Sequence, residues 1–119
     1  MIKVTFLMNR EKHSASLKIQ GHAGAAEKGQ DIICASASIL AYTLAQNINF
    51  EYRRGNLKAK PMIKLEEGDT TVSCKAKDDE CFAGILHAFL VIQTGYFLLE
   101  HNYPDFVSVK KLSDNEAKA

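Results

Sequence analysis

Apolar and polar residues alternate at the start of the chain, which predicts a β-hairpin. Every second residue of segment 2–8 is apolar, the period of a strand with one buried face. Segment 9–12 is polar and predicts a turn, after which the alternation resumes over 15–19. The pattern stops at Gly21. Two strands of opposite direction therefore open the predicted fold.

Two longer segments carry apolar residues at intervals of three and four, which predicts two amphipathic helices. The first begins at Asp31, whose carboxylate is a suitable N-cap, and ends at Gly55. The second begins near Asp78 or Asp79 and ends before Pro104. The first apolar stripe comprises Ile33, Ala37, Leu40, Leu44 and Ile48. The second comprises Phe82, Ile85, Phe89, Ile92, Tyr96 and Leu99.

Three further alternating segments, 57–65, 72–76 and 106–112, predict strands. Pro61 cannot donate to a hydrogen-bond ladder, which favours an edge position for the strand that contains it. The predicted element order is β-β-α-β-β-α-β. We therefore expect an α+β domain in which two helices pack on a mostly antiparallel five-stranded sheet.

The composition is that of an ordinary globular protein. The chain has 119 residues, of which 46% are hydrophobic and 24% charged, and this length suits one domain. We expect that domain to span 1–112 and to be followed by a polar tail, 113–119. Fifteen basic and fourteen acidic residues give a net charge of +1, which argues against electrostatic capture of nucleic acid.

The sequence predicts a cytoplasmic protein with free thiols. No run approaches the roughly 18 apolar residues that cross a bilayer, so we expect no membrane association. The first residues alternate too regularly for a signal peptide. The three cysteines, Cys34, Cys74 and Cys81, are odd in number and lack the CxxC spacing, which argues against a disulfide framework.

The segment between the hairpin and the first helix, 21–30, is predicted to be a mobile loop. It contains no large apolar residue that could anchor it to a core. Gly21, Gly24 and Gly29 permit backbone angles that other residues avoid. The loop carries His22, and a loop of this kind can close over a bound ligand as a lid.

Cys34 and His22 are the candidate catalytic residues. Cys34 falls in the opening turn of the predicted first helix, where the helix dipole and unpaired N–H groups stabilise a thiolate. The same N–H groups can hold an oxyanion that forms when the thiolate attacks a carbonyl. His22 precedes Cys34 by twelve residues, and the flexible chain between them can bring the imidazole within hydrogen-bond distance of the sulfur. The imidazole could then accept the thiol proton. The alternative is that Cys34 is a small apolar residue at the start of a helix and His22 an exposed loop histidine.

Two further polar residues have both a structural and a functional interpretation. Ser38 lies one helical turn after Cys34, so both side chains point the same way. Its hydroxyl either bonds the sulfur, the histidine or a substrate, or bonds back to the Cys34 carbonyl. Asp31 either caps the helix alone or also orients His22.

Other chemistries fit the sequence less well. Cys74 falls on the inward face of a predicted strand, which favours core packing. Cys81 opens the second helix, but no histidine lies near it in sequence. His13, His87 and His101 lack partners at metal-binding spacings, so we expect neither a metal nor a cofactor. The glycine loop lacks the GK[ST] ending of a P-loop. A thiol phosphatase needs an arginine a few residues after its cysteine, and the segment 35–40 contains none.

The segments Gly21-His22-Ala23-Gly24 and Asp31-Ile32-Ile33-Cys34-Ala35, with Gly29 between them and Ser38 after them, resemble the ribosomal-processing cysteine protease family Prp of bacteria. The likeness extends over nearly the whole chain. It implies a cysteine endopeptidase that removes the N-terminal extension of a large-subunit ribosomal protein, the twenty-seventh. It further implies that His22 and Cys34 are catalytic, that Asp31 and Ser38 support them, and that the protein is a homodimer.

A non-catalytic dimeric module is the alternative function. The lysines at 58, 60 and 64 would then bind ribosomal RNA or a ribosomal protein. A lysine run on an edge strand is more often a solvated surface that discourages aggregation.

Overall fold

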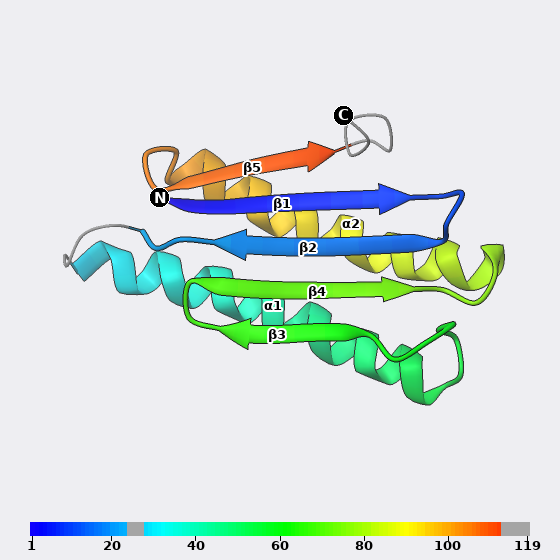
Figure 1. The fold of residues 1–119 in the computed structure, drawn as a ribbon. Helices are drawn as coiled ribbons and strands as arrows, with labels where there is room; N and C mark the ends of the chain where they lie inside the picture. Colours follow the sequence, from blue (N-terminus) through cyan, green and yellow to red (C-terminus); the bar gives the residue numbers. More distant parts are fainter. Residues whose placement is uncertain (24–27, 113–119) are drawn as a thin grey trace.

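The computed structural model describes residues 1–23 and 28–112, and for 28–31 it describes the backbone alone (Figure 1). The elements follow the predicted order: β1 (Ile2–Asn9), β2 (Ser14–Gln20), α1 (Lys28–Arg53), β3 (Met62–Glu66), β4 (Asp69–Lys75), α2 (Asp79–Asn102) and β5 (Val107–Leu112). The five strands form one sheet in the order β3-β4-β2-β1-β5. Only β1 and β5 pair in parallel; the other neighbours are antiparallel. The predicted α+β fold is confirmed.

Both helices cover the same face of the sheet, α1 toward β3 and α2 toward β5 (Figure 1). The core lies between this layer and the inward residues of the strands. Its largest fully buried side chains are Tyr96, Phe6, Phe82, Phe89 and Leu17. All six residues of the apolar stripe predicted for the second helix are buried, which confirms the helical period.

Helix α1 begins earlier than the sequence predicts. It starts at Lys28, so Asp31 lies within its first turn and the predicted N-cap at Asp31 is wrong. Nothing in 28–30 forces a later start, since Gly29 weakens a helix by only about 1 kcal/mol and no proline is present. The end of α1 is as predicted: Arg53 is its last residue and Gly55 follows with φ +79°.

The third strand is shorter than the sequence predicts. It begins at Met62, directly after Pro61, whereas Leu57 makes only an isolated bridge to Ala76. Pro61 lacks the N–H that a continuous ladder would need, which accounts for the late start. The strand lies at the edge of the sheet, as predicted.

Helix α2 has the predicted N-terminus. The side chain of Asp78 caps it by accepting a hydrogen bond from the Cys81 N–H at 2.8 Å. By length and composition alone α2 is also long and apolar enough to span a membrane, although no such helix was expected from the sequence. Its buried stripe packs against the sheet, and core helices of water-soluble proteins meet the same criteria.

Candidate active site

A cavity of about 330 Å³ opens where α1, the end of β2 and the β3–β4 turn meet. Cys34 and Ser38 line it from α1, His22 from the segment after β2, and Gly68 from the β3–β4 turn. The structure thus brings together three of the four polar residues predicted for the site. They come from separate parts of the chain, and the sheet order places those parts side by side.

Cys34 lies in the second turn of α1 and not in its opening turn, because the helix begins at Lys28. The unpaired N–H groups of a helix belong to its first four residues, so here they precede Cys34 by about one turn. The helix dipole is strongest within the first turn. The prediction that Cys34 sits among these N–H groups is therefore wrong by one turn. Its side chain is partly buried, with one side against the core and another on the cavity.

Ser38 lines the cavity one turn beyond Cys34. Two other hydroxyls of α1 bond back to carbonyls: Ser36 donates to Ile32 and Thr43 to Ile39, each at 2.7 Å. Within 1–23 and 28–112, the Ser38 hydroxyl makes no such bond. The geometry therefore favours the interpretation in which this hydroxyl serves the cavity over back-bonding to Cys34.

His22 is exposed and lies against Gly68 in the β3–β4 turn. The preceding residue, Gly21, donates its N–H to the Gly68 carbonyl at 3.0 Å. No hydrogen bond joins His22 to Cys34 among the residues described. The two residues therefore share a cavity without a hydrogen bond between them, and bound substrate would have to bring them into hydrogen-bond distance.

The remaining predicted site residues are only partly accounted for. Gly29 lies in α1, so the predicted loop 21–30 is shorter at its C-terminal end. Gly24 and the polar tail 113–119 lie outside the described residues. The side chain of Asp31 also lies outside them, and its role in orienting His22 stays a prediction.

Cys74 is a core residue, as its inward position predicted. It is buried, and this burial, with a smaller effect from Glu51, raises the pKa of its thiol to about 12. A thiol of this kind stays protonated and cannot compete as a nucleophile at neutral pH.

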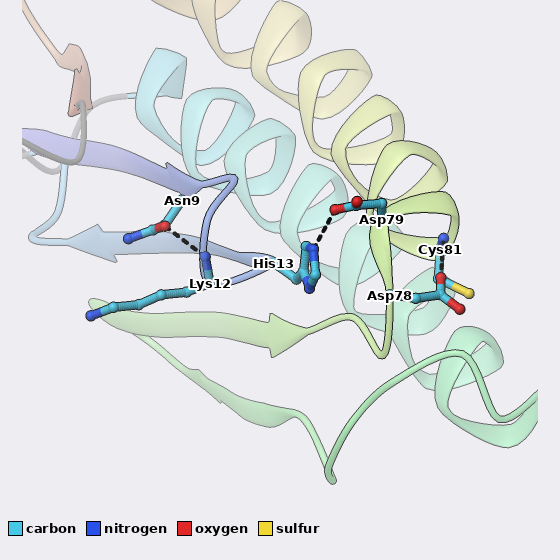
Figure 2. Close-up of polar contacts among 6 residues, drawn as sticks. All are labelled: Asn9, Lys12, His13, Asp78, Asp79 and Cys81. Carbon is cyan, nitrogen blue, oxygen red and sulfur yellow. Dashed lines mark hydrogen bonds and ion pairs between the residues drawn. The ribbon is translucent and has the colours of Figure 1, made fainter.

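A second group of polar residues lies at the start of α2, where His13 is beside Asp79 and Asp78 is beside Cys81 (Figure 2). Here His13 contacts Asp79, with 2.5 Å between Nε2 and Oδ1. The sequence did not reveal this contact because 66 residues separate His13 from Asp79. The link arises from the pairing of β2 with β4, which lets the His13 carbonyl accept from the Ala76 N–H at 2.8 Å. Burial and the neighbouring Asp78 carboxylate raise the pKa of Cys81.

Comparison with known proteins identifies the family. The family model described as cysteine protease Prp matches residues 1–108. The chain belongs to this family. It is a cysteine protease, and the alternative of a non-catalytic module is set aside. One of the three lysines behind that alternative, Lys64, is also partly neutralised by Asp69 at 2.6 Å.

Solved structures support the same fold. SMU.848 from Streptococcus mutans aligns with a TM-score of 0.67 and 25% identity, covering 96% of each chain. The essential ribosomal processing protease Prp from S. aureus, in complex with a covalently linked product peptide, aligns at 0.66 and 22% identity, covering 94% of this chain and all of that one. The same protease with a substrate peptide gives 0.66 and 19% over the same coverage. A comparison with curated proteins finds no match.

Proposed function

We propose that this cysteine protease removes the N-terminal extension of a ribosomal protein precursor, the twenty-seventh protein of the large subunit. The observation that supports the proposal is the shared cavity, which a cysteine, a histidine and a serine predicted from the sequence line together in a chain of the Prp family. The S. aureus protease with which this chain shares its fold is a ribosomal processing enzyme that binds peptides.

Cys34 is the nucleophile in this proposal. Its thiolate attacks the scissile carbonyl carbon, and the tetrahedral intermediate collapses to a thioester as the C–N bond breaks. His22, protonated after taking the thiol proton, gives that proton to the leaving amine. A water molecule, deprotonated by His22, then hydrolyses the thioester and releases the new carboxylate.

Peptide cleavage tests the proposal directly. The substrate is a peptide that spans the cleavage site of the precursor, and a scrambled peptide of the same composition is the control. Cys34→Ala and Cys34→Ser should each abolish cleavage while leaving the Tm unchanged within a few degrees. His22→Ala should lower kcat strongly at unchanged Tm. Cleavage that persists in both Cys34 variants would remove the nucleophile from the proposal.

We also propose that the protein acts as a homodimer in the cytoplasm. Large apolar side chains on the outer side of the helix layer support self-association, since Ile39 is 61% and Leu98 59% exposed. Sedimentation equilibrium should give twice the monomer mass, and Ile39→Lys with Leu98→Lys should shift the protein toward monomer. A monomeric wild-type protein at micromolar concentration would contradict the dimer.

A further inference from the structure

Gly68, in the turn between β3 and β4, lies directly against the His22 ring. A Cβ atom built at Gly68 would fall 2.6 Å from Nε2 and 2.8 Å from Cε1 of His22. Both distances are far shorter than a van der Waals contact. The ring therefore occupies space that any other residue type at position 68 would fill.

The same turn is also bonded to the chain that carries His22. The Gly21 N–H donates to the Gly68 carbonyl at 3.0 Å, and Gly21 has φ +92°. A Cβ at Gly21 would overlap the Met1 carbonyl oxygen, so Gly21 is closely confined. The backbone before His22 is thus fixed to the turn, and the imidazole reaches back over Gly68.

A comparison with Gly55 separates two reasons for a glycine. Gly55 has φ +79° and Gly68 has φ +76°, so the backbone favours glycine equally at both positions. A Cβ at Gly55 would have nothing within 4 Å. Of these two positions, Gly68 is the one at which the missing side chain also makes room for a neighbouring group.

We propose that Gly68 is a positioning residue that holds the His22 imidazole at the cavity that Cys34 lines. This inference rests on the proposed role of His22 in proton transfer. The β3–β4 hairpin holds Gly68 in a fixed place beneath the ring, because β3 and β4 pair continuously from Met62 with Ser73 to Glu66 with Asp69. A methyl group at position 68 displaces the ring and not the turn, because the overlapping atoms are the far end of a rotatable side chain.

The test compares Gly68→Ala with Gly55→Ala on the peptide substrate. Both variants carry the same backbone strain, so both should lower the Tm by a similar few degrees. Gly68→Ala should also lower kcat by roughly 100-fold, the effect of moving a catalytic group by about 1 Å. Gly55→Ala should keep the wild-type kcat. The pH at which iodoacetamide labels Cys34 half-maximally should shift in Gly68→Ala toward its value in His22→Ala.

The double variant His22→Ala/Gly68→Ala distinguishes the inference from the proposed function. If Gly68 acts through His22, the double variant should have the same kcat as His22→Ala alone. A wild-type kcat in Gly68→Ala combined with an impaired His22→Ala would overturn the positioning role and leave the proposed function intact. A wild-type kcat in His22→Ala would overturn the catalytic role of His22 and the positioning role with it.

Discussion

Helices α1 and α2 each carry a cysteine near the N-terminus, and the surroundings of these two thiols differ. Cys34 lies in the second turn of α1, beside a cavity that His22 and Ser38 also line. Cys81 lies in the first turn of α2, where the helix dipole is stronger. By helix position alone, Cys81 would be the better thiolate.

The carboxylates at the start of α2 act against a thiolate at Cys81. Asp78 caps the helix and Glu80 follows, and their negative charges oppose a thiolate at Cys81. Together with burial, which is the largest cause, they raise the pKa of Cys81. His13, on the hairpin that faces the start of α2, is paired with Asp79, as Figure 2 shows. A position in the first turn of a helix therefore does not suffice to activate a cysteine when neighbouring carboxylates oppose the thiolate.

The largest expected difference between the two sites is in catalysis. Cys34→Ala should lower kcat by about 10³-fold or more, whereas Cys81→Ala should keep the wild-type rate. The rates are measured on the same peptide at matched enzyme concentration. Cys74→Ala is not used as a control because it would open a cavity in the core. A strong loss of kcat in a folded Cys81→Ala variant would contradict the prediction that catalysis depends on Cys34 and not on Cys81.

Removing the carboxylates should make Cys81 more reactive. In Asp78→Asn/Glu80→Gln the capping oxygen is retained, but two negative charges that raise the Cys81 pKa are lost. Because the thiolate is the reactive form, the half-maximal pH for iodoacetamide labelling of Cys81 should move downward. Asp105→Asn, an exposed substitution away from α2's start, is the control and should leave it unchanged. An unchanged midpoint in the double variant would mean that burial alone sets the reactivity.

The packing of α1 near the cavity depends on a buried hydrogen bond. The Tyr96 hydroxyl on α2 donates to the Ala37 carbonyl at 2.7 Å, and Tyr96 is fully buried. Tyr96→Phe should therefore lower the free energy of unfolding by about 1 kcal/mol, measured by urea denaturation. At the other site, Asp79 is 92% exposed, and exposed ion pairs contribute at most about 1 kcal/mol. Asp79→Asn should cost less than Tyr96→Phe, and the opposite order would contradict this ranking.

The smallest expected effect concerns Gln93, which is buried in α2. Its Nε2 has no hydrogen-bond partner within the described part of the chain. Replacing an unpaired buried amide by an apolar group of similar size removes a desolvation cost. Gln93→Leu should leave the Tm unchanged or raise it by a few degrees in a thermal melt. A clear decrease would show that the amide has a partner in solution.

The sequence predicts most of the fold because its signals are local. Alternation located β1, β2 and β5, and the helical period identified the apolar residues that α2 buries, though not Gln93. The start of α1 was misplaced because Asp31 is a good cap in isolation, yet the residues before it also form a helix. The late start of β3 was missed because the alternation of apolar residues continues through Pro61.

The sequence could name the reactive residues of the site, but it could not show the contacts that position them. His22, Cys34 and Ser38 were chosen from spacing and resemblance, and they line one cavity. The contact of Gly68 with His22 depends on the pairing of β4 with β2, which no local pattern reveals. The proximity of His13 to Asp79 has the same origin.

Competitive labelling of the three cysteines in one sample tests the central claim most directly. The wild-type protein is treated with limiting iodoacetamide at about pH 6.5, well below the pH at which an ordinary thiol reacts, and the adducts are located by peptide mass spectrometry. The adduct should form at Cys34, with Cys74 and Cys81 unmodified, and Cys34 labelling should slow in His22→Ala. Labelling of Cys81 as fast as that of Cys34 would contradict the account.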